Sequence, residues 1–330
     1  MENEKNNNRV SIIEVKRFSE IIVRMKQEMG KIFFGHEEVV NSLLRALLCD
    51  GHVLVEGVPG IAKTLVVKVL AKVSGCTSNR VQFTVDLLPT DITGLTTYDP
   101  QRGFEIVKGP IFANFIIADE INRSPPKTQS AMLEAMQERQ VTIGKKTFML
   151  PSPFFVMATQ NPLETEGVYT LPEAQVDRFI FKVVYSYPKD EDEKRIMEDN
   201  TTFKKFEDVD IRPIVSPQRI EEMQKLTHRI YIDEKIKQYI MEIVKKTRNK
   251  DFKYGEYVEL GGSPRASIFL YIASKADALL QGRTYVTPGD VDNIAHDVLR
   301  HRIILSYRAQ AEGISPEKII DEILANVKAM

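Results

Sequence analysis

The sequence has few cysteines, almost no net charge and no long apolar run. The two cysteines, Cys49 and Cys76, form no CxxC pair, which favours buried thiols in a reducing compartment over a disulfide framework. The 45 basic and 46 acidic residues nearly cancel, so the chain has no overall field that attracts nucleic acid or an anionic membrane. No apolar run approaches the roughly 18 residues of a membrane span, and residues 1–8 are too polar for a signal peptide. We therefore expect a soluble, cytoplasmic protein without a membrane span.

Side chains that could ligate a metal are also sparse. The five histidines show no metal-ligand spacing with cysteines or carboxylates, so a metal held by protein side chains alone is not expected. They are His36, His52, His228, His296 and His301. Each is more typical of a surface residue or of a histidine whose hydrogen bonds are satisfied.

The order of apolar segments predicts two domains, which the length of 330 residues also favours. Up to about Pro188, apolar runs typical of buried parallel strands alternate with helical patterns, and beyond it only helical periodicity recurs. We predict an α/β domain with a parallel sheet over residues 1–188, of which 1–10 are disordered, and an all-helical domain over 189–330. The expected strands are 53–55, 81–85, 115–120, 154–159 and 179–184, with hairpins within 96–107 and 141–150. Helices are expected over 12–29, 37–48, 191–198, 217–226, 233–247, 264–280, 288–300 and 316–328, and from Ser124.

Residues 57–64 have the spacing of a phosphate-binding loop. The segment follows the apolar run 53–55 and leads into an apolar helix, a context in which backbone N–H groups and a helix N-terminus cradle phosphates. It reads Gly57, Val58, Pro59, Gly60, Ile61, Ala62, Lys63 and Thr64, with Leu65 continuing into the helix. Lys63 would neutralise the outer phosphates, and the Thr64 hydroxyl would ligate Mg²⁺. Ala62 stands where the usual pattern has glycine, and an ordinary Gly/Pro loop is the alternative.

The apolar turn 32–36 connects the first two predicted helices. With Gly35 and His36 it could close over a flat ligand such as a nucleotide base. A simple hydrophobic connector between helices is the equally good alternative.

Two carboxylates and an amide follow predicted buried strands. Asp119 and Glu120 end the run 115–120, and Asn161 follows the run 154–159. Ligands of open parallel sheets bind at the carboxyl ends of the strands, so we expect these side chains beside the phosphate loop. We assign Asp119 to Mg²⁺, Glu120 to the attacking water, and Asn161 to holding that water or sensing the γ-phosphate. Surface acids at a strand end and a plain turn at Asn161 are the alternatives.

Two arginines complete the candidate set. Arg178 lies just before the last predicted strand, and Arg265 follows Ser263 and Pro264, which are typical of a helix start. A cation in the first helical turn opposes the helix dipole by about 0.3–1 kcal/mol, so its presence there favours an anion in front of it. A surface arginine with an acidic neighbour is the alternative.

Five segments together resemble the motifs of MoxR-type AAA+ ATPases. They read VEGVPGIAKT (55–64), ADEINR (118–123), ATQNP (158–162), AQVDRF (174–179) and GSPRA (262–266). The resemblance implies Walker A at 57–64, Walker B at Asp119 and Glu120, sensor 1 at Asn161, an arginine finger at Arg178 and sensor 2 at Arg265. It also implies ATP and Mg²⁺ as cofactors, a helix-2 insert at 96–107, a pre-sensor-1 hairpin at 141–150 and a helical lid. In that family Ala62 is a familiar variant.

The resemblance also implies an assembly. An arginine finger acts on the γ-phosphate of the neighbouring subunit, so the active form would be a homo-oligomer, namely a hexameric ring. Sensor 2 would belong to the lid of the subunit whose phosphate it senses, so that phosphate release rotates the lid relative to the α/β domain.

Three functions are compatible with these motifs. The leading one is ATP-driven remodelling, activation or maturation of partner proteins, including partners with a von Willebrand factor A domain. The second is a nucleic-acid motor with Lys145 and Lys146 at a hairpin tip as phosphate contacts, which the neutral overall charge disfavours. The third is a nucleotide-dependent scaffold with little turnover.

Overall fold

The structure is a computed structural model that describes residues 10–33, 36–57, 63–161, 167–185, 190–200 and 209–329. Some sequence-based predictions fall outside these ranges. They are the disorder of residues 1–9, the roles of Gly35 and of Val58, Pro59, Gly60, Ile61 and Ala62, and the domain boundary near Pro188.

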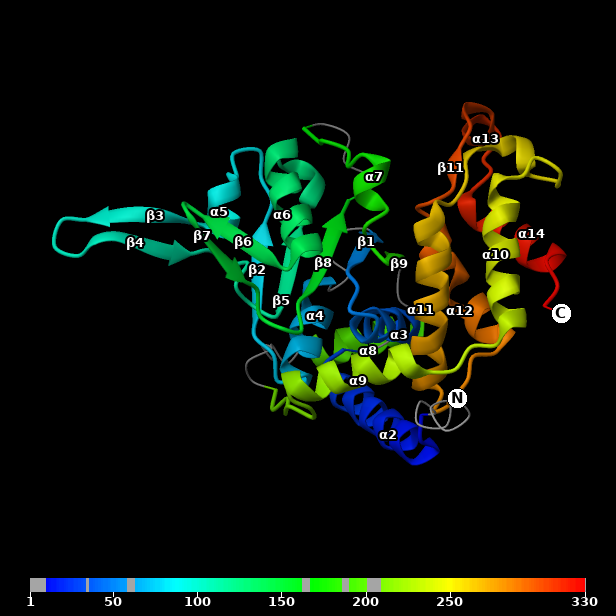
Figure 1. The fold of residues 1–330 in the computed structure, drawn as a ribbon, viewed down its shortest axis with the longest axis horizontal. Helices are drawn as coiled ribbons and strands as arrows, with labels where there is room; N and C mark the ends of the chain where they lie inside the picture. Colours follow the sequence, from blue (N-terminus) through cyan, green and yellow to red (C-terminus); the bar gives the residue numbers. More distant parts are fainter. Residues whose placement is uncertain are drawn as a thin grey trace, which may run out of the picture.

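Five parallel strands form the central sheet (Figure 1). In spatial order they are β2 (Ser78–Gln82), β5 (Phe115–Asp119), β8 (Phe155–Gln160), β1 (Val53–Gly57) and β9 (Phe181–Tyr185). The strands β5, β8 and β1 are buried over most of their length, because helices cover both faces of the sheet. The predicted α/β domain with a parallel sheet is confirmed.

The edge strand β2 begins earlier than the sequence predicts. Alternation of apolar and polar residues placed it at 81–85, but the pairing with β5 starts at Ser78 and ends at Gln82. The first three residues of β2 are exposed, because an edge strand is covered less completely than a central one. Hydrophobic patterning therefore does not mark this half of the strand.

Alternate strand residues face two separate apolar cores. On one face, Val53 and Val55 pack against α2 (Ile12–Met29), α3 (Glu37–Leu48) and α4 (Lys63–Val73). On the other face, Leu54 packs in the core that includes α6 (Pro126–Glu138), near α5 (Pro89–Thr93) and α7 (Glu173–Val176). The helix expected from Ser124 begins at Pro126, since Ser124 is buried and extended.

Two antiparallel hairpins leave the sheet domain, as predicted. One pairs β3 (Gly94–Asp99) with β4 (Gly103–Lys108), and the other pairs β6 (Gln140–Ile143) with β7 (Lys146–Met149). The first projects far from the body of the molecule (Figure 1). Its exposed Tyr98 and Phe104 rings meet edge to face, with centroids 5.2 Å apart.

His52 illustrates a correctly predicted satisfied histidine. It lies buried just before β1, where its Nδ1 accepts from the Val156 N–H at 3.1 Å and its Nε2 donates to the Met136 carbonyl at 3.1 Å. Burial lowers the pKa of His52 to about 3, which keeps the ring neutral. This residue therefore links β1, β8 and α6.

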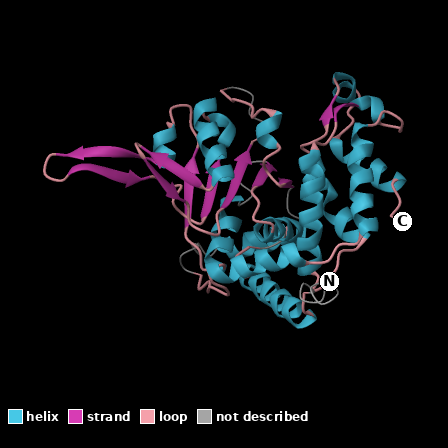
Figure 2. Cartoon of the chain, in the orientation of Figure 1, coloured by secondary structure: helices cyan, strands magenta, loops and turns pink. Residues whose placement is uncertain are grey.

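The C-terminal part is mainly helical (Figure 2). Its helices are α8 (Asp190–Asn200), α9 (Pro217–Arg229), α10 (Glu234–Arg248), α11 (Pro264–Leu280), α12 (Pro288–Leu299), α13 (Tyr307–Ala311) and α14 (Pro316–Asn326), with a 3₁₀ turn η3 (Gly255–Tyr257). The prediction of helices alone is wrong in one respect, because β10 (Val258–Leu260) and β11 (Ile304–Leu305) form an antiparallel pair. Strands this short show no measurable period in the sequence. None of the helices in the described ranges is long and apolar enough to cross a membrane.

The C-terminal helices pack directly on the sheet domain. The larger apolar core continues from α3 and α4 into α9, α10, α11 and α12. Within it, Arg45 of α3 donates from Nε to Asp277 Oδ1 of α11 at 2.6 Å, and Asn293 of α12 donates to Asp277 Oδ2 at 3.1 Å. The two charged side chains are 5% and 0% exposed. Burial raises the pKa of Asp277, and the Arg45 guanidinium opposes this rise.

We expect Arg45→Ala to lower the free energy of unfolding by about 3–5 kcal/mol, because it leaves a buried carboxylate without its cation. The measurement is urea unfolding followed by circular dichroism. Arg24→Ala, which removes an exposed arginine from α2, is the matched control and should change stability little. An equal decrease in the free energy of unfolding in the two variants would contradict the role of the buried ion pair.

Candidate functional site

The carboxyl ends of three central strands bring the first group of candidate residues together. Gly57 ends β1, Asp119 ends β5, and Asn161 follows β8 at the same edge of the sheet. Because the strands are parallel and paired in this register, residues that follow them emerge side by side. Lys63 and Thr64 open α4, the helix that follows β1.

Lys63 lies among carboxylates at this edge. Its Nζ donates to the Gly57 carbonyl, and the side chain is half-buried. Burial lowers the pKa of Lys63, while the carboxylates of Asp119, Glu120 and Glu56 oppose the shift. The ammonium therefore sits where it can exchange the carbonyl for a more negative ligand.

Asp119 is held by two side chains that the sequence analysis did not single out. Thr159 of β8 donates from Oγ1 to Asp119 Oδ1 at 2.6 Å. Arg80 of β2 donates from Nη2 and Nε to Asp119 Oδ2 at 2.6 and 3.0 Å. Both oxygens of the carboxylate are thus fixed by the neighbouring strands.

Glu120 leaves the strand in a turn conformation. Its φ of 56° is left-handed, and the short 3₁₀ turn η1 (Ile121–Arg123) follows. Its backbone N–H donates to Thr159 Oγ1 at 2.8 Å, while its carboxylate accepts from Gln82 at 2.8 Å and from Arg123 at 3.0 Å. The buried Thr159 hydroxyl therefore bridges Asp119 and Glu120. In the sequence, the only indication of this role is that Thr159 is a lone hydroxyl residue in an apolar strand.

His36 lies close to the start of the phosphate loop. It begins α3 with a left-handed φ of 55°, and its ring lies 4.8 Å from the Tyr185 ring, centroid to centroid. Tyr185 is the strand partner of Gly57. Burial lowers the pKa of His36 and raises that of Tyr185, whose buried hydroxyl has no hydrogen-bond partner within the described part of the chain. Sequence reasoning named His36 but missed Tyr185.

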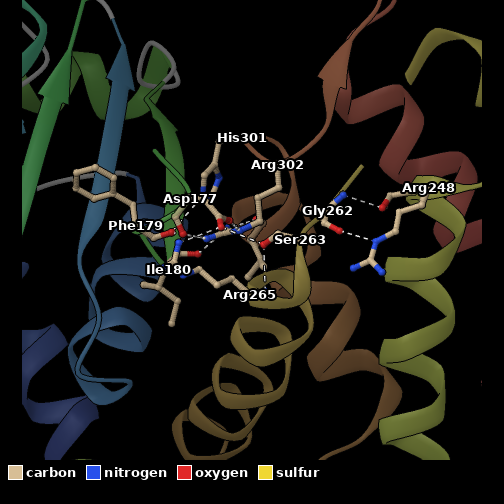
Figure 3. A network of polar contacts seen from close by, with 11 residues as sticks. Asp177, Phe179, Ile180, Arg248, Gly262, Ser263, Arg265, His301 and Arg302 are labelled. Carbon is tan, nitrogen blue, oxygen red and sulfur yellow. Dashed lines mark hydrogen bonds and ion pairs between the residues drawn. The ribbon is translucent and has the colours of Figure 1, made fainter. Parts of the chain in front are cut away.

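The two candidate arginines lie elsewhere. The loop that carries Arg178 precedes β9, and Ile180 donates its N–H to the carbonyl of His52, just before β1, at 2.9 Å. Arg265 lies beside this loop, with Nη1 3.4 Å from Asp177 Oδ2 (Figure 3). The five residues of β1, roughly 13 Å from first to last Cα, separate this place from Gly57, which ends the strand on the side of Lys63. The structure therefore does not place Arg265 with the Lys63 of its own chain, contrary to our expectation, because the lid packs against the amino end of β9.

The available donors suit Mg²⁺ better than a metal bound by protein alone. Among the described residues, no three His, Cys, Asp or Glu side chains are grouped to hold an ion. The Thr64 hydroxyl and the Asp119 carboxylate are hard oxygen donors, the type that Mg²⁺ combines with waters and substrate phosphates. These residues fit a magnesium ion that arrives with a phosphate ligand.

Comparison with known proteins gives matches for both parts of the chain. Residues 52–181 match the ATPase family associated with various cellular activities (AAA), and residues 255–323 match the AAA lid domain. The chaperone MoxR1 of Mycobacterium tuberculosis is 46% identical over 307 residues, covering 91% of this chain and 80% of that protein. The uncharacterized protein YeaC of Bacillus subtilis is 44% identical and covers 92% of each chain. The crystal structure of a proposed ATPase from Cytophaga hutchinsonii superposes with a TM-score of 0.90 at 44% identity, over 96% of this chain and 97% of that one.

Replacing the bridging hydroxyl tests the geometry of this site. We expect Thr159→Val to lower the free energy of unfolding by about 1–3 kcal/mol, because the Glu120 N–H and an Asp119 oxygen lose their partner. Thr159→Ser keeps the hydroxyl and should lower the free energy of unfolding by a smaller amount. Thr142→Val, on an exposed hairpin strand, is the control in chemical denaturation. If Thr159→Val matched the wild type, the bridge would not stabilise the fold.

Proposed function

Because the chain belongs to the MoxR family of AAA+ ATPases, we propose that it binds ATP with Mg²⁺, hydrolyses it, and uses the cycle to remodel or activate partner proteins. The observation that carries this proposal is the meeting of Lys63, Asp119 and Glu120 at one edge of the sheet. A half-buried ammonium beside two fixed carboxylates suits a site where phosphate charge and a water must both be held.

Each residue at this edge receives one role in the proposal. Residues 57–65 bind the phosphates, with the Lys63 ammonium on the outer ones. Thr64 and Asp119 hold Mg²⁺, which when bound supplies positive charge against the phosphate oxygens. Glu120, oriented by Gln82 and Arg123, accepts a proton from the attacking water. Asn161 holds that water or senses the γ-phosphate, and Gly35 and His36 contact the base.

We expect Glu120→Gln to bind ATP nearly as well as the wild type but to hydrolyse it roughly 10²–10⁴ times more slowly, because an amide cannot take the proton. Binding is measured with a fluorescent ATP analogue and turnover by phosphate release. Glu234→Gln, at an 84% exposed glutamate of α10, is the matched control. An unchanged turnover would remove Glu120 from this role, and a wild type without turnover would favour the scaffold.

The distribution of the candidate residues supports an oligomeric site. Lys63, Asp119 and Glu120 lie at one end of β1, whereas Arg178 and Arg265 lie near the other. We propose that both arginines act on the γ-phosphate bound by the neighbouring copy, in a ring that we take to be a hexamer. An arginine supplied by another subunit stabilises charge that develops during phosphoryl transfer.

The proposed partners are other proteins. One relative is named a chaperone. We propose that the partners of this chain include proteins with a von Willebrand factor A domain. The projecting hairpin β3–β4 offers exposed Tyr98 and Phe104 for such contacts. A nucleic-acid motor is not favoured, since Lys145 and Lys146 are only two exposed lysines at the tip of β6–β7 and the net charge is -1. A cytoplasmic location is part of the proposal.

We expect Arg178→Ala to bind nucleotide but to lose hydrolysis by about 10³–10⁵-fold, because the neighbour's transition state loses its cation. Wild-type turnover per chain should also rise with protein concentration as the oligomer forms, which analytical ultracentrifugation can follow in parallel. Arg308→Ala, at a 64% exposed arginine of α13, is the control. Full activity in isolated monomers would contradict the shared site.

A further inference from the structure

Three consecutive residues after α12 hold the backbone around Arg178. Arg300 donates from Nη1 to the Lys182 carbonyl at 2.5 Å, and His301 donates from Nε2 to the Phe179 carbonyl at 3.2 Å. Burial lowers the pKa of His301, so the ring is neutral and its Nε2 carries the proton that the carbonyl accepts. Side chains that follow α12 therefore attach the lid to backbone carbonyls at the start of β9.

Arg302 makes the most extensive of these contacts (Figure 3). Its side chain is 1% exposed, and Nε donates to Asp177 Oδ1 at 2.7 Å. Nη2 donates to the carbonyls of Asp177 and Phe179 at 2.9 and 2.6 Å. Nη1 donates to the carbonyl of Ile180 at 3.3 Å and to the carbonyl of Val298. One planar guanidinium thus fixes the residues before and after Arg178. A lysine ammonium cannot donate hydrogen bonds in the same set of directions.

Asp177 extends this connection to Arg265. Its Oδ2 accepts from Ser263 Oγ at 3.0 Å and lies 3.4 Å from Arg265 Nη1, so the carboxylate joins the N-terminus of α11 to Arg302. Both oxygens of Asp177 are occupied in this way. Arg178 forms no ion pair within the described ranges, and its buried Nε has no hydrogen-bond partner there. Its charge is therefore available to an anion from outside the chain.

We propose that Arg302 is a positioning residue that holds the 177–180 segment to the lid and so directs Arg178, together with Arg265, at the phosphate bound by the neighbouring subunit. This inference rests on the proposed function of Arg178. A lid that moves would carry both cations with it, because the contacts to Arg300, His301 and Arg302 all join the same two segments. A merely structural ion pair would stabilise the fold without affecting the neighbour's site.

The first measurement uses Arg302→Lys and Asp177→Asn, which weaken the connection from its two sides. Both variants should bind a fluorescent ATP analogue within about twofold of the wild type, because Gly57 and Lys63 lie at the other end of β1. Both should hydrolyse ATP about 10²-fold more slowly, since small misplacements of a catalytic group have effects of that size. Arg308→Lys, at an exposed lid arginine, is the matched control. Asp177→Asn keeps the Arg302 guanidinium and serves if Arg302→Lys does not fold.

Mixed oligomers separate positioning from stability. Arg302→Lys chains keep Glu120, whereas Glu120→Gln chains keep a correctly held Arg178, so a mixture contains sites with both. In an equimolar, randomly mixed ring about a quarter of the sites are complete, and turnover should recover to about that fraction of the wild type. Mixing Arg302→Lys with Arg178→Ala produces no complete site and should give no recovery.

The outcomes are distinguishable. Recovery with Glu120→Gln but not with Arg178→Ala supports the positioning role. Wild-type turnover in both Arg302→Lys and Asp177→Asn overturns it, and so does a mixture with Glu120→Gln that stays inactive. Full turnover in Arg178→Ala alone would overturn the shared site itself, and with it this inference.

Discussion

All strands of the central sheet run in the same direction, and this parallelism decides where each polar side chain can act. Residues that follow β1, β5 and β8 reach one edge, which is why Lys63, Asp119 and Glu120 meet although more than fifty residues separate the first from the others. Residues that precede β9 reach the opposite edge, which places Arg178 away from them. The helices on both faces bury the strands and so hold these two edges at a fixed separation.

Much of this arrangement could be predicted from the sequence, because the phosphate loop, the paired carboxylates and the buried strands are local patterns. Residues that act across strands could not. Arg80 and Thr159 belong to β2 and β8, and only the strand register shows that both reach Asp119. The start of β2 and the short pair β10–β11 were missed because exposed or very short strands have no hydrophobic period. The location of Arg265 depends on how the lid packs, which no local pattern contains.

The lid is joined to the sheet domain by two kinds of contact with different physical character. The Arg45–Asp277 pair and the apolar side chains around it lie in the interior, where separating the charges would be costly. The Arg302 contacts are made mostly to backbone carbonyls, so they fix the course of the chain and not only one side chain. The first kind stabilises the association of the helices with the sheet, whereas the second transmits the position of the lid to the loop that carries Arg178.

Lys63 and the loop that carries Arg178 lie at opposite ends of β1, so each chain is directional, with a proposed phosphate-binding end and an arginine end. A twofold axis can complete two such sites only where both ends of the chain lie in one self-complementary patch, because every contact across that axis occurs twice. In the proposed ring the contacts are heterologous, which means that one surface of each chain meets a different surface of the next. Repeated contacts of this kind close into a ring when the rotation per subunit divides the circle, and otherwise continue as a helical filament. In the proposed ring, the angle between neighbouring chains therefore decides whether every shared site is complete.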